Sequence, residues 1–441
     1  MEILTKVSAV AARPPAPIPA PDIFVERSRT DVWRFAMLAL PLALLLAAFK
    51  VYRIEQPIFF LLACLVFGGF AVSYWLPFRF KETFLILLSL GGAYVLLSPL
   101  VASLLIVVAL ALFGIIRSGL DYRWRVLAIL GVLGVGIYLR STSRFESLEK
   151  FWPVLGAIFM FRMIIYLYDV KGMKTPPRLK DYLAYFFLLP NYYFLLFPVV
   201  DYQTFRKGFY RRDIHAIAQQ GVWWIFRGTT HLLLYRLIYQ WQSHFTPPTV
   251  SVGVAVVAKI LFCYLLYLRV SGQFHIIVGM LCLFGYDLPE TYHRYLLANS
   301  INDLWRRNNI YWKEFMVKIV YFPTYFKLRK KGGLQAELWS TAAVIFVTWF
   351  LHAYQFYWLN GVFRVTTNDS IFWAILGAVM LVNVWVDFRH RGRPRLTGKA
   401  AWMKNGLQVA ATFCFMALLW SMWSAESIAD WFSFLRTGMT S

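Results

Sequence analysis

The sequence predicts an all-α, multi-pass integral membrane protein, and three observations support that class. The chain of 441 residues is 59% hydrophobic and 19% aromatic, whereas a soluble globular protein is about 45–50% apolar. Apolar runs long enough to cross a bilayer recur along the whole length. The formal net charge of +23 gathers in short segments between those runs, which is typical of cytoplasmic loops and argues against a nucleic-acid partner.

The N-terminal third is predicted to be a tail followed by transmembrane helices. Residues 1–31 form a Pro-rich tail, and three arginines that precede the first span place it on the cytoplasmic side. Residues 32–150 contain the first transmembrane helices. Within them, the uncharged run 83–116 would be about 50 Å long as one helix, against a bilayer core of about 30 Å. Gly91, Gly92 and Pro99 therefore predict a break inside this run.

The remainder of the chain is predicted to continue as one membrane domain without a soluble part. Residues 151–360 contain further apolar segments, several of them short for a straight crossing, and residues 361–441 contain the last transmembrane helices. In total we expect roughly 11–13 membrane segments, with short amphipathic helices around a central cavity. Four basic loops are assigned to the cytoplasm, at residues 171–180, 206–212, 327–331 and 389–399.

The cysteines predict neither a disulfide framework nor a zinc site. All four are scattered through apolar runs, and no CxxC pair exists. They are Cys64, Cys263, Cys282 and Cys414. We interpret them as buried small hydrophobic residues, and we predict no metal ion and no bound cofactor.

A polar stripe lies on one of the predicted membrane helices. Thr341, Thr348, His352 and Gln355 recur at steps of 7, 4 and 3 residues, which places them on one face of a helix. An ionisable residue inside an apolar run is costly and marks a functional site by default. His352 is therefore the first candidate for a functional residue, because a neutral imidazole can accept a proton near physiological pH.

A second candidate lies earlier in the chain, in a block of polar and aromatic residues. Asn302, Trp305, Asn309, Trp312 and Met316 recur at helical spacing. This pattern predicts one amphipathic helix with Asn309 on its buried face. An amide and an imidazole that both point inward are predicted to form a reaction centre.

Four segments also carry a family resemblance. In order along the chain they are similar to segments of the membrane-bound O-acyltransferase (MBOAT) family: FRMIIYLYDVKG (161–172), RLKDYLAYFFLLPNYYFLLFPVVDYQTF (178–205), FGYDLPETYHRYLLANSINDLWRRNNIYWKEF (284–315) and TWFLHAYQFYW (348–358). The resemblance covers roughly residues 151–360 and is greatest to the bacterial branch that acetylates polysaccharides such as alginate. That branch usually has a histidine where Asn309 stands, while other MBOAT branches have asparagine, so the acceptor stays open.

The resemblance implies an MBOAT-like catalytic core over residues 151–360 and an O-acyltransferase activity. The enzyme would move an acyl group, acetyl in the bacterial branch, from a thioester of coenzyme A or of an acyl carrier protein to a hydroxyl of a cell-surface glycan or related acceptor. His352 would act as the general base, and Asn309 would donate its amide N–H to the acyl carbonyl or orient the acceptor. No serine or cysteine is paired with His352 in the sequence, which favours direct transfer over an acyl-enzyme.

Residues around the two candidates are expected to bind the donor or the acceptor. Arg306 and Arg307 would bind donor phosphates, with a contact to lipid headgroups as the alternative. Trp305, Tyr311 and Trp312 would line the acyl path or anchor the chain at the membrane interface. The whole predicted set is Trp305, Arg306, Arg307, Tyr311, Trp312, Thr348 and Gln355.

The expected partners are the lipid bilayer, the thioester donor and the hydroxyl acceptor. Because no soluble domain is found in the sequence, a periplasmic or membrane partner protein is a further possible partner. The expected location is the bacterial inner membrane.

Three alternatives to this function stay open. The first is an acyltransferase that acts on a lipid, a protein or a secondary metabolite with a longer acyl chain. The second is a transporter or flippase, which predicts duplicated halves, although we find no such repeat. The third is an inactive relative that serves as a scaffold.

Overall fold

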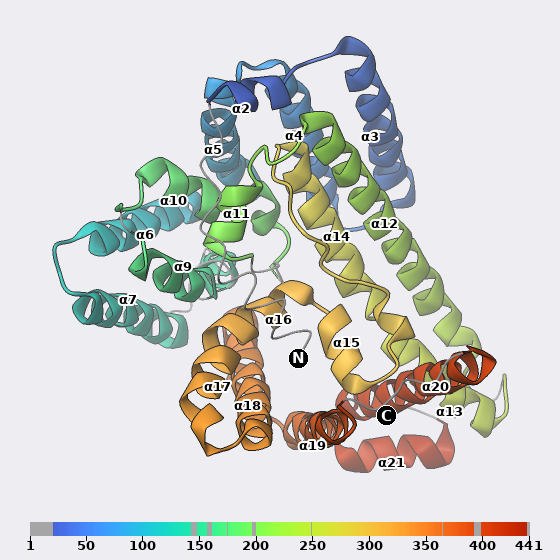
Figure 1. Ribbon diagram of the computed structural model, residues 1–441. Coiled ribbons are helices and arrows are strands. Elements are labelled where there is room, and N and C mark those ends of the chain that lie inside the picture. The colour runs from blue at the N-terminus through green and yellow to red at the C-terminus, as the bar shows by residue number, and fades with distance from the viewer. Residues whose placement is uncertain are drawn as a thin grey trace.

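The computed structural model is built from α-helices (Figure 1), which confirms the all-α, multi-pass prediction. It describes residues 21–142, 148–156, 161–173, 175–195, 200–247, 249–363, 365–391 and 398–438. Within these ranges no β-strand forms, and a single isolated antiparallel bridge joins Phe209 to Tyr286. Most of the predicted Pro-rich tail, residues 1–20, lies outside the described part of the chain.

In the described ranges, eight helical segments are long and apolar enough to cross a membrane. They are Val32–Tyr52, Pro57–Trp75, Pro99–Arg117, Tyr122–Thr142, Val252–Leu283, Gly333–Asn360, Thr367–Arg389 and Gly398–Trp423. Large apolar side chains such as Leu44 and Val107 stay exposed on them, as lipid-facing surfaces require. The chain is therefore a multi-pass membrane protein. Eight candidate spans in the described ranges are fewer than the predicted 11–13 membrane segments, because some predicted segments form short helices and others, such as the long α12 (Ile214–Trp241), are more polar.

The first helices run in sequence order with short connections. They are α2 (Pro21–Arg27), α3 (Val32–Tyr52), α4 (Pro57–Trp75), α5 (Phe78–Leu96), α6 (Pro99–Arg117) and α7 (Tyr122–Thr142). The predicted break in the uncharged run is confirmed, because α5 ends at Leu96 and α6 begins at Pro99. The Ser98 hydroxyl accepts a hydrogen bond from the Val101 N–H at 3.3 Å, and Pro99 starts the helix where a missing N–H costs little.

Between α7 and α12 the chain forms short helices: α8 (Phe151–Val154), α9 (Phe161–Lys171), α10 (Leu179–Phe186) and α11 (Tyr202–Gly208). The apolar residues 182–195 do not form a helix long enough to cross a membrane, since α10 ends at Phe186 and a 3₁₀ turn follows at Leu189–Tyr192. Tyr166, Tyr182 and Tyr185 are completely buried there, with ring centroids 5.6 and 6.0 Å from Tyr166. Packing among aromatic rings, in place of lipid contact, buries these apolar residues.

Helices α12 (Ile214–Trp241) and α14 (Leu268–Leu283) pack side by side along most of their length (Figure 1). Gly221 faces Gly279, and Gly228 faces Gly272. A Cβ atom added at Gly221 would lie 2.7 Å from the Gly279 carbonyl oxygen, and one at Gly228 would lie 2.5 Å from the Gly272 oxygen. The two backbones approach this closely because the four contact positions carry no side chain.

The part of the chain that follows α12 contains the two candidate functional residues. Its helices are α13 (Val252–Leu265), α15 (Ile301–Arg307), α16 (Ile310–Met316), a π-helical turn at Val317–Tyr321, α17 (Phe322–Leu328), α18 (Gly333–Asn360), α19 (Thr367–Arg389), α20 (Gly398–Trp423) and α21 (Ile428–Thr437). Helix α18 packs against α17, the π-helical turn and α19, while α20 packs against α13 and α19. The polar stripe predicted on residues 341–355 thus lies on a single long helix in the middle of this group.

Ion pairs connect two of the predicted basic loops to each other and attach another to α18. Arg206 on α11 pairs with Glu82 on α5 at 2.6 Å and with Asp181 on α10 at 3.0 Å, which ties the loops at 171–180 and 206–212 together. Arg391, after α19, pairs with Glu337 on α18 at 2.6 Å. Residues 392–397 of the fourth loop lie outside the described ranges.

Candidate functional site

His352 lies in the middle of α18, a helix that is long and apolar enough to span the membrane, yet its side chain is exposed. Two aromatic rings from neighbouring helices lie beside the exposed imidazole. The Trp312 ring of α16 lies 5.8 Å from the imidazole, centroid to centroid, and the Trp373 ring of α19 lies 5.0 Å away. His352 is therefore accessible at a place where three helices meet.

The hydrogen bond of His352 determines which ring nitrogen is available. Its Nδ1 lies 2.8 Å from the backbone carbonyl oxygen of Thr348, one helical turn earlier. A carbonyl oxygen only accepts, so Nδ1 carries the proton and donates. In the neutral ring Nε2 then has a free lone pair, and none of the described residues hydrogen-bonds to it. The imidazole is oriented so that Nε2 can accept a proton from another molecule.

Trp312 connects the two predicted functional residues. Its indole Nε1 donates to the Thr348 hydroxyl at 3.4 Å, and its ring faces the His352 imidazole. Its backbone N–H donates to the Asn309 side-chain Oδ1 at 3.3 Å. Thr348 is completely buried, whereas Trp312 is half-buried. Asn309, Trp312, Thr348 and His352 thus form one contiguous polar and aromatic cluster.

The single amphipathic helix predicted around Asn309 is wrong. The chain forms two short helices, α15 and α16, and Asn309 lies at the break between them as the N-cap of α16. Its backbone has φ 42° and ψ 62°, a left-handed conformation that asparagine tolerates better than most residues. With Oδ1 occupied by the Trp312 N–H, the side-chain Nδ2 is the group left free to donate.

The loop between α14 and α15 holds this break in place, and no spacing in the sequence singled out this loop. The Ile310 N–H donates to the Thr291 carbonyl at 2.8 Å, and the His293 N–H donates to the Arg307 carbonyl at 2.9 Å. The Tyr311 hydroxyl donates to the Pro289 carbonyl at 2.7 Å. Hydrogen bonds on both sides of the Asn309 turn therefore stabilise its left-handed backbone.

The same loop is anchored at its start by a buried carboxylate. Asp287 pairs with Arg211 at 2.7 Å and with Arg212 at 2.6 Å, with only 3% of its side chain exposed. Burial works to raise the pKa of Asp287, but hydrogen bonds from Arg212 and Arg211 outweigh it and hold the pKa below its ordinary value. The carboxylate is therefore ionised at neutral pH and keeps the loop attached to the start of α12.

A second polar cluster lies behind the loop, between α12 and α14. His275 Nδ1 lies 3.3 Å from the Thr291 hydroxyl, and His231 Nδ1 lies 3.0 Å from the Ser271 hydroxyl. Arg227 pairs with Glu290 at 2.7 Å. In the described part of the chain, no group of three or more His, Cys, Asp or Glu residues could hold a metal ion. Glu290 and Thr291 of the loop are thus bonded to side chains of α12 and α14.

No contact with the imidazole is recorded for the remaining predicted site residues in the described part of the chain. Arg306 and Arg307 both pair with Asp303, at 3.6 and 2.8 Å, so each guanidinium already has a carboxylate partner. Trp305 on α15 is half-buried against the core, and Tyr311 is buried and holds Pro289. Gln355 is half-buried one turn after His352. Trp373, which contacts His352, was not among the predicted residues, because nothing in the sequence relates α19 to α18.

Comparisons of the chain with models of known protein families and with curated proteins find no match. The similarity to MBOAT segments therefore stays a prediction.

Proposed function

We propose that this protein is a membrane-bound O-acyltransferase that moves an acyl group from a thioester to a hydroxyl acceptor. The observation that carries the proposal is the geometry of His352, an exposed residue at a junction of three helices whose Nδ1 is fixed by the Thr348 carbonyl, which leaves Nε2 without a partner among the described residues. A histidine that serves only packing would not need an accessible lone pair at membrane depth.

The proposed reaction needs one base and one donor. Nε2 of His352 takes the proton of the acceptor hydroxyl as its oxygen attacks the thioester carbonyl carbon. The Nδ2 group of Asn309 stabilises the negative oxygen of the tetrahedral intermediate. The C–S bond then breaks, and the imidazolium returns its proton to the leaving thiolate. Donor and acceptor are held together, so no acyl-enzyme is required.

The proposal includes the substrate classes that the sequence resemblance implies. The donor is acyl-CoA or an acyl carrier protein, and the preferred acyl group is acetyl. The acceptor is a cell-surface glycan or a related molecule, and the location is the inner membrane of a bacterium. A lipid, protein or small-metabolite acceptor with a longer acyl chain is the alternative within the same chemistry.

The first test is thioester turnover by the purified full chain in detergent, with acyl-CoA donors from acetyl to palmitoyl. We expect release of free CoA with one donor class and a loss of about 10²-fold or more in the His352→Ala variant, since a general base contributes on that scale. His390→Ala is the matched control, because its Nδ1 also donates to a carbonyl one turn earlier, at 2.8 Å, but lies exposed at the end of α19.

Equal release by the wild type, His352→Ala and His390→Ala would overturn the assignment of the base. If no donor reacts even when a carrier-protein thioester and a glycan acceptor are supplied, the acyltransferase proposal is wrong.

A further inference from the structure

A basic pocket lies far from His352 in the sequence and in the fold. Six residues line it: Phe78, Arg79, Glu82, Arg178, Lys180 and Phe209. They come from the start of α5, the start of α10 and the end of α11. The cavity has a volume of about 330 Å³, which is large enough for a phosphate group with part of its substituent.

The pocket lies at the end of a membrane span. Helix α4, one of the eight candidate spans, ends at Trp75, three residues before Phe78. Lys81 closes this end, because its Nζ donates to the carbonyl oxygens of Ser73 at 2.6 Å and Tyr74 at 2.9 Å. Trp75 and Phe80 remain 47% and 46% exposed beside it. Exposed aromatic rings at a span end are typical of the headgroup region.

Cations outnumber carboxylates in the pocket. Its one carboxylate, Glu82, is already paired with Lys180 at 3.2 Å and with Arg206 at 2.6 Å. Arg178 pairs with Asp181 through Nε at 3.3 Å, but 77% of its side chain stays exposed. Arg79 lies over the Phe80 ring at 4.6 Å, and none of the described carboxylates pairs with it. The lining therefore has positive charge left over for an external anion.

Two helix starts add to this positive character. The N-cap residues of α5 and α10 are Pro77 and Arg178, and neither side chain accepts a hydrogen bond from the first N–H groups of its helix. The first N–H groups of these two helices therefore have no side-chain acceptor at the N-cap, and the start of a helix favours a nearby anion.

We propose that this pocket binds the phosphate of an anionic phospholipid headgroup from the adjoining leaflet, with Arg79 and Lys180 as its main ligands. A headgroup fits better than a soluble anion because the pocket adjoins a span end and has Phe78 and Phe209 as apolar walls beside the cations. Acyl chains can follow the exposed apolar surface of the span while the phosphate stays in the pocket. The site is independent of the proposed acyl transfer.

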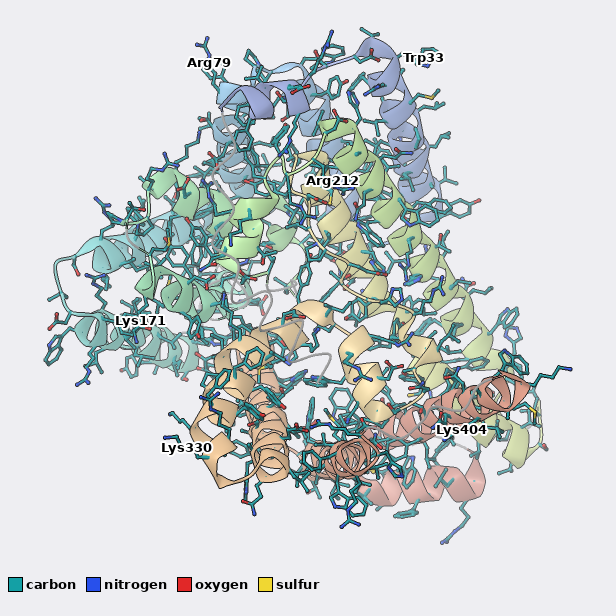
Figure 2. The ribbon with its side chains drawn as sticks, in the orientation of Figure 1. Trp33, Arg79, Lys171, Arg212, Lys330 and Lys404 are labelled. Carbon is teal, nitrogen blue, oxygen red and sulfur yellow. The ribbon has the colours of Figure 1, made fainter. Side chains whose placement is uncertain are left out.

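The test measures lipid binding to the purified full chain in detergent by native mass spectrometry. The probes are phosphatidylglycerol and phosphatidylcholine with identical acyl chains. We expect preferential binding of phosphatidylglycerol and about a tenfold or greater loss of that preference in the Arg79→Gln/Lys180→Gln variant, since each basic residue near a charged headgroup adds about 1 kcal/mol. The control is Lys330→Gln/Lys404→Gln, which removes two exposed lysines at the other end of the molecule from Arg79 in Figure 2.

Three results would overturn the proposal: equal binding of the two lipids, an equal loss in the control variant, or displacement of phosphatidylglycerol by millimolar inorganic phosphate or adenosine 3′,5′-diphosphate. The last result would assign the pocket to a soluble phosphate ligand. If the double variant does not fold, Arg79→Gln alone carries the test, because no ion pair is lost with it.

Discussion

Asn309 combines a structural and a proposed chemical task, and substitutions can separate them. Its Oδ1 caps α16 through the Trp312 N–H, and its backbone is left-handed at φ 42°. Asn309→Asp keeps an oxygen cap but removes the amide N–H. Asn309→Gly accepts the backbone angle and loses only the side chain. Asn309→Ala loses the cap and also strains the backbone.

We expect Asn309→Gly to change the free energy of unfolding by only a few tenths of a kcal/mol, and Asn309→Ala to lower it by roughly 1–3 kcal/mol. Asn309→Asp is expected to fold normally and to lose most turnover, because a carboxylate cannot donate to an oxyanion. Thermal unfolding in detergent and CoA release measure the two effects. Full turnover by Asn309→Gly would show that the side chain has no chemical role.

At the scale of elements, the contact between α12 and α14 depends on glycine. A Cβ atom at Gly228 would lie 2.5 Å from the Gly272 carbonyl oxygen and 2.7 Å from the Ile276 side chain. Since the nearest atom belongs to the backbone, the two helices must separate to admit a methyl group. That separation would also disturb His231 and His275, which lie on the same pair of helices.

We therefore expect Gly228→Ala to lower the free energy of unfolding by about 1–3 kcal/mol, measured by thermal unfolding in detergent. The matched control is Gly131→Ala in α7, where a Cβ atom would meet nothing within 4 Å. This control should be neutral or more stable by up to about 1 kcal/mol, because alanine favours a helix over glycine. Equal destabilisation by both variants would contradict the close contact.

On the scale of the whole molecule, the helices near the C-terminus are packed into the rest of the protein. The Trp420 ring of α20 lies 6.1 Å from Tyr264 on α13 and 5.1 Å from Tyr267, which precedes α14. Asn368 on α19 donates to the Ala425 carbonyl at 2.8 Å. These contacts connect residues 361–441 to the central region, so one cooperative unit is expected in place of separate domains.

Buried thiols can report this cooperativity. Cys282 on α14 is completely buried, as is Ala417 on α20. In a chain without the other three cysteines, Cys282 should react with a thiol-specific dye only on thermal unfolding. A second variant, with Cys282 also replaced and Ala417→Cys introduced, should react at the same midpoint. A clearly lower midpoint for the Ala417→Cys reporter would show that the C-terminal helices unfold on their own.

The sequence by itself determined the class of the protein and the location of several of its membrane helices. Long apolar runs can only be helical in a bilayer, because every backbone polar group must be satisfied within its own segment. For the same reason the break before Pro99 and the single helix that carries Thr348 and His352 were predictable. Both depend on residues close together in the chain.

Only the tertiary structure decided what surrounds those residues. Helical spacing predicted one helix through Asn309, but hydrogen bonds from the loop between α14 and α15 stabilise a left-handed turn there. The contact of Trp373 with His352 and the glycine contact between α12 and α14 also join distant segments. Periodicity records which face of a helix is apolar, whereas the partner of that face depends on how helices pack in three dimensions.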